Sequence, residues 1–458
     1  MEYITHKIAD YALNLKYQDL SPEAVKEVKR YLLDSAGCAY GGSVTKDVNI
    51  YIDYYQHLGG KPEASIFNSK LKFPNEHATL LNALMIRALD YNDIYWEEDP
   101  SHPSDIIPAA LTPAEILGKS GRELIVAIIL AYEFEMRMCE IAHPGIRERK
   151  WHHATLTAFV SPIVAGKIMG LSKEQMVHAI GISASKHATF GCVTAGHLTM
   201  MKNTVDPLAT QSGVIAAELA QRGYEGPAHA IEGKEGMVQT IVGGAWDVEG
   251  LVRGLGKDPY RILRCSMKAF PTEALTHSPF SALLKIRREH EIASKDIEEI
   301  TIKTVARAAD ILSDPSKYHP TTRETADHSL PYCVAALILD GKLTSEQFTD
   351  ERINAPDIRD MIHRVKVLAE PRYEKMFPAK KPAGAVIRTK DGRSFAAEVD
   401  FPKGDYRNPL SDEEITVKFD SMVLDKISQS KRDRMVDMIW NLEEVKDVRE
   451  LMKAFAGQ

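Results

Sequence analysis

The spacing of apolar residues changes once along this chain, near Lys268, and that change limits what the chain can fold into. Before it, apolar residues recur every three to four positions, as in the segments Glu123 to Met138 and Thr155 to Gly170. This is the spacing of one face of an α-helix. After it, Ile300 and Ile302 alternate with polar neighbours, which is the spacing of a half-buried strand. The sequence therefore predicts a mainly α protein with a smaller α+β part.

The chain returns to helical spacing after Ser411, so its tail can pack against the first helical part. At 458 residues the chain is also too long for one ordinary domain. We therefore expect a large all-α helical domain over residues 1–266, a smaller inserted α+β domain over 267–404, and a C-terminal return to the helical domain over 405–458.

Local signals predict where several elements begin and end. Ser21–Pro22 has the N-cap and first helical residue of a helix that we expect to end at Gly37. Asp206–Pro207 predicts the start of another helix. The residues 390–393, Lys-Asp-Gly-Arg, predict a type I′ hairpin turn between two strands. No strand alternation interrupts the chain before about residue 265.

Charge and cysteine usage exclude several classes of protein. The 57 Lys and Arg and 64 Asp and Glu residues leave a dispersed charge of -7, without the basic stripe of a nucleic-acid-binding protein. No stretch has the uncharged length of a membrane span, and the N-terminus lacks the apolar core of a signal peptide. The five cysteines are scattered, without a C-x-x-C motif. We therefore expect reduced thiols, no local zinc or iron-sulfur motif, and a cytoplasmic protein.

A dense cluster of acidic and histidine residues follows an apolar helical run. The segment Ala88 to Pro108 reads ALDYNDIYWEEDPSHPSDIIP, and its three prolines keep it from continuing as a helix. Such a segment is either a functional site or a solvated acidic cap.

Two histidines precede an apolar helix in the segment Lys-Trp-His-His-Ala-Thr at 150–155. A histidine at a helix N-terminus faces the positive end of the helix dipole, which suits a neutral base. Adjacent histidines point in different directions, so we expect at most one of His152 and His153 to line a site. A capping or surface imidazole is the alternative at each position.

Two lysines and a tyrosine lie near predicted helix starts or at the expected domain junction. Lys202 lies just before a predicted helix start, where a lysine and helix amides can bind one anion, although a surface lysine is the alternative. Lys268 shares a segment with His277 at the expected domain junction, where ligand clefts form. Tyr332 follows a proline in the first turn of a predicted helix and either supplies a proton or packs. Without a phosphate-binding Gly-rich loop, these groups indicate acid-base chemistry on a small polyanion.

Five motifs occur in order along the chain: ALDYND followed by HPSD, WHHAT, MKNTVDPLATQSG, MKAFP with a following histidine, and ETADHSLPY. On these motifs the chain resembles the MmgE/PrpD family along nearly its whole length. The resemblance implies an all-α domain built from both ends of the chain, an inserted α+β domain and a site between them. It also implies a homodimer without an organic cofactor.

The resemblance further implies the site residues. They are Asp90, His102, His152 and Tyr332 as catalytic residues and Lys202, Lys268 and His277 as substrate-binding residues, with no metal ligand. Members of the family include 2-methylcitrate dehydratase, cis-aconitate decarboxylase and an iminodisuccinate epimerase, all of which act on small polycarboxylates.

The reaction type is open within the family. Ile94 stands where the decarboxylase branch has threonine, the acidic spacer Tyr95 to Pro100 is longer, and ETADHSLPY resembles the dehydratase branch. The sequence therefore favours a cofactor-independent lyase that dehydrates 2-methylcitrate to 2-methyl-aconitate. A cis-aconitate-type decarboxylase or an iminodisuccinate-type epimerase is the alternative.

Dehydration of a polycarboxylate needs a base, an acid and cations for the developing charge. As a hypothesis, the lysines 202 and 268 bind substrate carboxylates, and either His102 or His152 removes the proton. Asp90 orients an imidazole, and Tyr332 is the acid.

Two alternative functions belong to other classes of protein. One is a metal-dependent helical enzyme in which Mg²⁺ is bound against a diphosphate by the acidic residues Asp90, Asp93, Glu97 and Asp99. The chain lacks the second acidic set that such a site needs. The other is a non-catalytic, dimer-forming helical scaffold.

Overall fold

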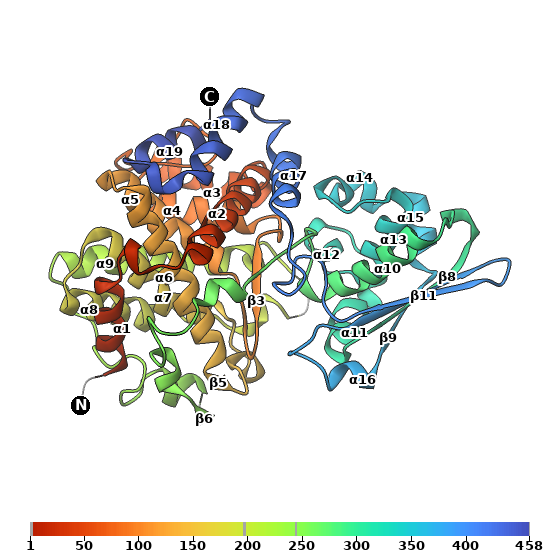
Figure 1. Cartoon of the computed structure of the whole chain (residues 1–458), viewed down its shortest axis with the longest axis horizontal. Coiled ribbons are helices and arrows are strands. Elements are labelled where there is room, and N and C mark those ends of the chain that lie inside the picture. The colour runs from red at the N-terminus through yellow and green to blue at the C-terminus, as the bar shows by residue number, and fades with distance from the viewer. Residues whose placement is uncertain (1–2, 196–197, 243–244, 458) are drawn as a thin grey trace. The chain divides into compact units, whose positions relative to one another are not determined.

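The computed structural model describes residues 3–195, 198–242 and 245–457. The chain forms two compact units. The first comprises Met1–Gly196, Met200–Cys265 and Ser411–Gln458, and the second is built mainly from Ser266–Leu410. Helices dominate the first unit and a small sheet with helices forms the second (Figure 1), so the predicted mainly α class with an α+β part is confirmed.

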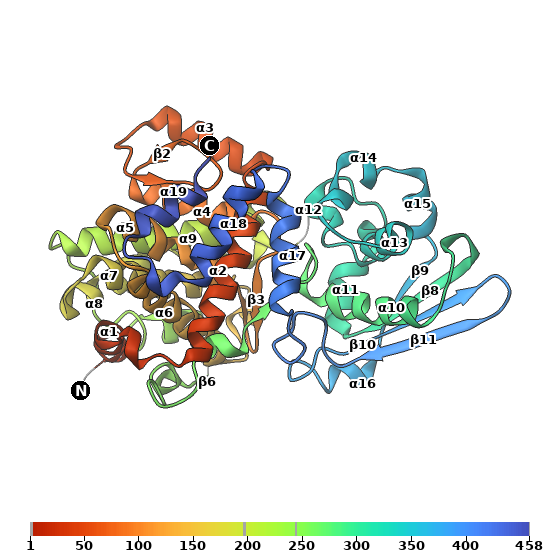
Figure 2. The same ribbon diagram turned by 45° about the horizontal axis from the view of Figure 1, so that its top comes forward.

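The first unit is a bundle in which α4, α7 and α8 pack against α9, while α2 packs against α4 and α17 (Figure 2). Its helices are α1 (Ile4–Asn14), α2 (Pro22–Gly42), α3 (Lys46–Leu58), α4 (Asn75–Arg87), α5 (Ile107–Leu117), α6 (Gly121–Glu140), α7 (Ala154–Met169), α8 (Lys173–Lys186), α9 (Met201–Gln221), α17 (Asp412–Val423), α18 (Gln429–Trp440) and α19 (Val448–Phe455). None of the described helices is both long enough and apolar enough to cross a membrane.

Short strands also occur in this unit, although no strand alternation in the sequence indicated them. They form three antiparallel pairs: β1 (Ala64–Ser65) with β2 (Lys72–Phe73), β3 (Asp93–Trp96) with β4 (Pro100–Ser101), and β5 (Ala142–His143) with β6 (Ala245–Trp246). These strands are too short to show alternation, and all four residues of β3 are buried. A strand buried on both faces has no polar side to mark it in the sequence.

The helix α2 begins as predicted, with the Ser21 hydroxyl accepting a hydrogen bond from the Ala24 amide. It does not end at Gly37 but continues to Gly42. A Cβ atom on Gly37 would lie 2.8 Å from Met422 Cε and 3.2 Å from Phe419 Cα, both in α17. The glycine therefore permits close helix packing and is not a helix stop.

The helix α9 begins at Met201 rather than after Asp206, and Pro207 lies inside it. Asp206 does not cap the helix, because its carboxylate lies beside His153 of the neighbouring chain segment. Because the helix starts earlier, both Lys202 and Asp206 belong to it. They are four residues apart and therefore lie on the same face of the helix.

The second unit contains a four-stranded sheet in the order β11-β10-β8-β9, antiparallel except for the parallel pair β8 and β9. Its strands are β8 (Ile297–Thr304), β9 (Val365–Ala369), β10 (Ala383–Thr389) and β11 (Ser394–Val399), and β7 (Ser266–Met267) opens the unit. Helices α10 (His277–Glu289), α11 (Ala306–Ser313) and α13 (Leu330–Asp340) pack against the sheet. The shorter helices are α12 (Arg323–Ala326), α14 (Asp350–Ile353), α15 (Pro356–Ile362) and α16 (Pro371–Glu374).

The predicted hairpin joins β10 to β11, but its turn is not type I′. Gly392 has a φ of +88°, whereas Asp391 is not in the left-handed region that a type I′ turn requires. The Asp391 carboxylate instead accepts hydrogen bonds from the Thr389 hydroxyl at 2.5 Å and the Arg393 amide at 3.3 Å. These bonds hold the aspartate in an ordinary conformation and leave the glycine alone to take the positive φ.

Candidate functional site

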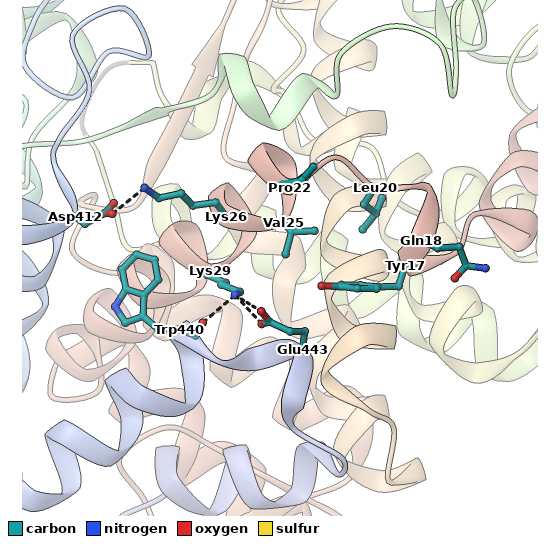
Figure 3. A pocket seen from close by; sticks show the side chains of 10 residues that line it. All are labelled: Tyr17, Gln18, Leu20, Pro22, Val25, Lys26, Lys29, Asp412, Trp440 and Glu443. Carbon is teal, nitrogen blue, oxygen red and sulfur yellow. Dashed lines mark hydrogen bonds and ion pairs between the residues drawn. The ribbon is translucent and has the colours of Figure 1, made fainter.

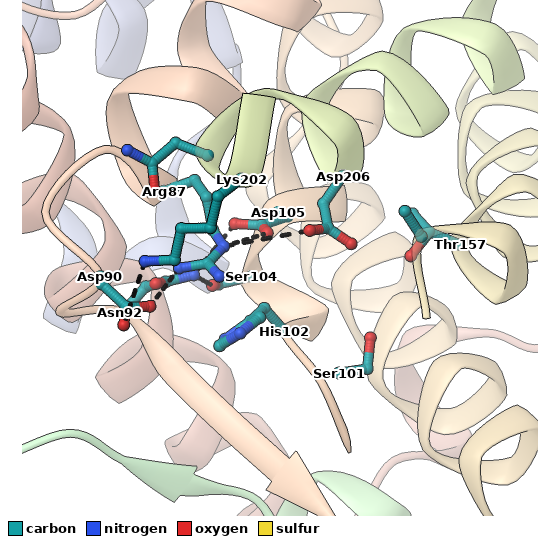
Figure 4. A network of polar contacts seen from close by, with 12 residues as sticks. Arg87, Asp90, Asn92, Ser101, His102, Ser104, Asp105, Thr157, Lys202 and Asp206 are labelled. Atoms are coloured by element: carbon teal, nitrogen blue, oxygen red, sulfur yellow. Dashed lines mark hydrogen bonds and ion pairs between the residues drawn. The ribbon is translucent and has the colours of Figure 1, made fainter. Parts of the chain in front are cut away.

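A buried cluster of two cations and three carboxylates lies in the first unit, where α4 ends and α9 begins (Figure 4). Arg87 forms an ion pair with Asp90, and its Nε lies 3.5 Å from Asp105 Oδ2 and 4.0 Å from Asp206 Oδ2. Lys202 Nζ lies 3.3 Å from Asp90 Oδ2. All five side chains are almost fully buried. Charges so placed interact strongly, and each depends on its partners to offset the loss of water.

The carboxylates of this cluster differ in protonation. Burial raises the pKa of Asp105 well above its ordinary value, although Arg87 opposes the shift. Burial would also raise the pKa of Asp206, but His153, followed by His152 and Arg87, lowers it below its ordinary value. Asp206 is therefore the ionised member of this pair, and Asp105 takes up a proton more readily.

The backbone of Asp90 places its carboxylate in the cluster. Asp90 has a φ of +49° just beyond α4, and its amide donates to the Arg87 carbonyl at 3.0 Å. Aspartate is one of the few residues other than glycine that adopt this left-handed conformation readily. The turn brings the carboxylate beside both Arg87 and Lys202, and the orienting of an imidazole by Asp90 stays a prediction.

The tautomer of His102 follows from its main-chain contact. Its Nδ1 lies 2.6 Å from the Asp93 carbonyl oxygen. A carbonyl oxygen only accepts, so Nδ1 carries the proton and Nε2 is the basic nitrogen. The Asp93 carboxylate is held in turn by the Ser104 amide and hydroxyl, the latter at 2.7 Å. These contacts fix the orientation of the His102 ring, and its role as a base stays a prediction.

In His152 the main chain donates a hydrogen bond to Nδ1 instead of accepting one from it. Its Nδ1 accepts a hydrogen bond from the Ala154 amide at 3.1 Å, so the proton of the neutral ring is on Nε2. Burial, followed by the neighbouring His153, lowers the pKa of His152 well below its ordinary value. His152 is therefore a neutral donor whose lone pair is already engaged.

The rings of the two adjacent histidines lie together, so they do not point in different directions as expected. Their ring centroids are 3.9 Å apart, and the rings of His153 and His102 are 5.6 Å apart. His153 Nε2 lies 3.2 Å from Asp206 Oδ1. Because His153 is the N-cap residue of α7, the first turn of that helix directs both imidazoles into the cluster.

Glu135, on α6, is a fully buried carboxyl near this cluster. It accepts hydrogen bonds from the Ser101 hydroxyl at 2.5 Å and the Thr157 hydroxyl at 2.8 Å, and it forms no ion pair within the described part of the chain. Burial raises its pKa to about 8, although the two hydroxyl groups oppose the shift. Glu135 therefore carries a proton in the folded protein at neutral pH.

We expect this proton to make stability depend on pH. The folded protein keeps a proton that the unfolded chain releases above the ordinary value of 4.5, so the free energy of unfolding falls as pH rises from 4.5 to about 8. A Glu135→Gln variant keeps an acceptor for both hydroxyls and should lose much of this fall, on the order of a few kcal/mol. Urea unfolding near both limits measures the difference. The exposed Glu174→Gln variant is the control, and identical pH dependence in wild type and Glu135→Gln contradicts the prediction.

The other predicted residues lie in the second unit. Lys268 follows β7, His277 begins α10, and both side chains are buried. The His277 ring packs edge-on against Phe270, with centroids 5.4 Å apart. Their roles stay predictions.

Tyr332 lies in the core of the second unit. Its ring is fully buried and its hydroxyl donates to the main-chain carbonyl of Gln347. Burial raises the pKa of this phenol above its ordinary value. The phenolic proton is engaged in this hydrogen bond, and the role of Tyr332 as the acid stays a prediction.

A pocket of about 530 Å³ also occurs in the first unit (Figure 3). It is lined by Tyr17, Gln18, Leu20, Pro22, Val25, Lys26, Lys29, Asp412, Trp440 and Glu443. Its two lysines already pair with acids, Lys29 with Glu443 at 2.6 Å and Lys26 with Asp412 at 2.9 Å. None of the lining residues belongs to the polar cluster, so the pocket is not our candidate for binding a polyanion.

The structure brings Asp90, His102, His152 and Lys202 into one region of the first unit. Sequence reasoning missed Arg87, His153 and Asp206 as members of this region. Arg87 did carry a signal, since it interrupts the apolar run of α4, and a charge on a buried helix needs partners. The sequence signal at Asp206 was misleading, because Asp-Pro is common at helix starts.

Comparison with known proteins gives matches at both ends of the chain. The MmgE/PrpD N-terminal domain matches residues 6–249 and the MmgE/PrpD C-terminal domain matches residues 270–444. A cis-aconitate decarboxylase from Homo sapiens is 24% identical over 100% of this chain and 95% of its own length. One from Aspergillus terreus is 22% identical over 98% and 95%. A 2-methylcitrate dehydratase from Salmonella typhimurium is 23% identical over 87% and 85%.

Proposed function

This chain belongs to the MmgE/PrpD family, and from that membership we propose that it is a lyase acting on a small polycarboxylate. The observation that carries the proposal is Lys202. Its ammonium group is buried beside Asp90 and has no hydrogen-bond acceptor among the described residues. An ammonium group has three donors, so Lys202 has donors to offer a substrate carboxylate.

We propose dehydration of 2-methylcitrate to 2-methyl-aconitate as the reaction. His102 Nε2 removes the proton next to a substrate carboxylate, because its other nitrogen is held as a donor to Asp93. Lys202 and Arg87 stabilise the charge that develops on the substrate. We assign proton delivery to the leaving hydroxide to His153, which is held beside Asp206, in place of Tyr332.

An assay of four substrates tests this proposal. Purified protein is incubated with 2-methylcitrate, citrate, cis-aconitate and iminodisuccinate, and products are followed by proton NMR. We expect loss of water from 2-methylcitrate with the appearance of a carbon-carbon double bond. Absence of turnover of all four compounds would count against a polycarboxylate enzyme and favour a non-catalytic scaffold.

Decarboxylation of a cis-aconitate-like acid is the second candidate. It is favoured by the decarboxylases from Homo sapiens and Aspergillus terreus, which align over nearly the whole chain. The reaction uses the same cations and one fewer proton-transfer group, so it does not need an acid for a leaving hydroxide. Release of CO₂ from cis-aconitate, without loss of water from 2-methylcitrate, would decide for this candidate.

We expect catalysis to be independent of a metal ion, because the proposed steps use only imidazoles, carboxylates and cationic side chains. After exhaustive dialysis against EDTA, kcat/KM should be unchanged or higher. Retention of less than about half of the activity, restored by a divalent cation, would show that a metal takes part.

We also propose a cytoplasmic homodimer that associates through the helical unit, as the family resemblance implies. Light scattering at micromolar concentration should give twice the chain mass of 51.1 kDa. A mass equal to that of one chain would exclude a stable dimer.

A further inference from the structure

One carboxyl group of the first unit joins the two segments that carry the histidines proposed for proton transfer. Glu135 on α6 accepts hydrogen bonds from the Ser101 hydroxyl at 2.5 Å and the Thr157 hydroxyl at 2.8 Å, and both bonds end on the same atom, Oε1. All three side chains are almost fully buried. The other oxygen, Oε2, has no hydrogen-bond partner in the described part of the chain. Glu135 therefore contacts both segments through one shared acceptor.

Each of the two hydroxyl groups is close along the chain to an imidazole. Ser101 ends β4 and directly precedes His102. Thr157 lies one turn beyond His153 on α7, and its amide donates to the His153 carbonyl at 3.4 Å. Ser101 and Thr157 are labelled in Figure 4. Because the strand and the helix are separate segments, the shared oxygen sets their spacing at this point, where the rings of His102 and His153 are 5.6 Å apart.

The protonation of Glu135 suits this arrangement. Burial, assisted by the negative charge of Asp206, raises its pKa to about 8 against the effect of the two hydroxyls. The neutral carboxyl accepts both hydrogen bonds without placing a second negative charge near the pair of His153 and Asp206. Glu135 can thus hold the two segments together without changing the charge of the site.

We propose that Glu135 is a positioning residue that fixes His102 relative to His153. It acts through the hydroxyls of Ser101 and Thr157. This role rests on the proposed function, in which His102 removes a proton and His153 delivers one, because both rings must then meet one substrate. A displacement of about 1 Å can lower the rate of an enzyme about 100-fold. Since Glu135 acts on the rings and not on the substrate, its loss should lower kcat and leave KM nearly the same.

Two substitutions of Glu135 separate positioning from a merely structural role. Glu135→Gln keeps an amide oxygen in the place of Oε1, whereas Glu135→Leu fills most of the same space without an acceptor. We expect Glu135→Leu to lose about tenfold to 100-fold in kcat, with KM within about threefold of wild type. Glu135→Gln should stay within about threefold in both constants. The control is Ser161→Ala, which removes a buried hydroxyl of α7 that donates to the Ala209 carbonyl at 2.9 Å, and it should keep kcat.

Two kinetic results overturn the proposal. One is equal kcat in wild type and Glu135→Leu. The other is a loss in Glu135→Gln as large as that in Glu135→Leu, because the acidic proton and not the shared acceptor would then be what matters. Thermal unfolding shows whether each variant is folded.

A double-mutant cycle tests the two hydrogen bonds separately. Ser101→Ala and Thr157→Val each remove one donor to Glu135, and each should lower kcat at least about threefold. Neither should lower kcat further in the Glu135→Leu background, because the acceptor is already absent. Losses that multiply in the double variants would overturn the shared contact. If Glu135→Leu does not fold, the two single variants carry the test.

Nitrogen NMR of protein labelled at the histidine rings gives a readout that does not need turnover. Signals of His102 and His153 are assigned from the His102→Gln and His153→Gln variants. We expect Glu135→Leu to shift or broaden both sets of signals, whereas Glu135→Gln and Ser161→Ala should leave them in place. Ring signals in Glu135→Leu that match wild type overturn the positioning role. Protein that shows these changes but turns over none of the four acids supports the positioning and contradicts the proposed function.

Discussion

A His102→Gln variant is expected to lose about 100-fold to 10,000-fold in kcat/KM, because the substitution removes the general base. The glutamine amide can still donate to the Asp93 carbonyl, which replaces the 2.6 Å hydrogen bond of Nδ1 and preserves the loop. The acidic limb of the pH profile of kcat/KM, which reports protonation of the base, should disappear together with the activity.

His152→Gln is the matched comparison for this prediction. The lone pair on its Nδ1 is engaged by the Ala154 amide, so we expect a loss in kcat/KM of less than about tenfold. Equal losses in the two variants would contradict the assignment of His102 as the base. A larger loss in His152→Gln would transfer that role to His152.

A Lys202→Met variant is expected to lose at least about thirtyfold in kcat/KM. A charge-assisted contact to a carboxylate that strengthens in the transition state contributes roughly 2 to 5 kcal/mol. Methionine has a similar apolar stem, so the packing of α9 should be kept. The loss should appear on whichever polycarboxylate proves to be the substrate, and Lys268→Met should behave in the same way.

The exposed Lys186 at the end of α8 provides the control. Lys186→Met should stay within about threefold of wild type, because a solvated lysine contributes only a few tenths of a kcal/mol. If Lys202→Met and Lys268→Met also stay within about threefold, neither lysine binds a substrate carboxylate. The histidines would then be the remaining candidates for catalysis.

Much of the fold could be predicted from sequence, because the signals for it are local. The N-cap at Ser21, the helical spacing of the first part and the strand alternation near Ile300 each depend on neighbouring residues only. The errors occurred where a distant contact decides the outcome. Gly37 reads as a helix stop until α17 is seen to pack against it, and Asp206 reads as a cap until His153 is found beside it.

In the candidate site, too, the sequence predicted what depends on local motifs and missed what depends on distant contacts. Ordered motifs identified Asp90, His102, His152 and Lys202 as candidates, because motif spacing survives in the sequence. Which imidazole acts as the base could not be predicted, since it depends on whether the Asp93 carbonyl or the Ala154 amide faces the ring. Tyr332 was named as a catalytic residue from its family motif, and its hydrogen bond to the Gln347 carbonyl is a contact that the motif could not predict.

Because the chain returns to the first unit after Leu410, the second unit is completed before the first during synthesis. Lys418 of α17 pairs with Asp34 of α2 at 2.5 Å and donates to the Tyr91 carbonyl at 2.6 Å, next to Asp90. During synthesis the second unit is complete once Leu410 has left the ribosome, whereas the helical unit still lacks α17, α18 and α19. Until then the surface of α2 around Gly37 is uncovered and available to chaperones or to other nascent chains. The segment that follows Leu410 therefore completes the support of the loop that carries Asp90, and products that stop at Leu410 should be recovered as aggregates rather than as weakly active enzyme.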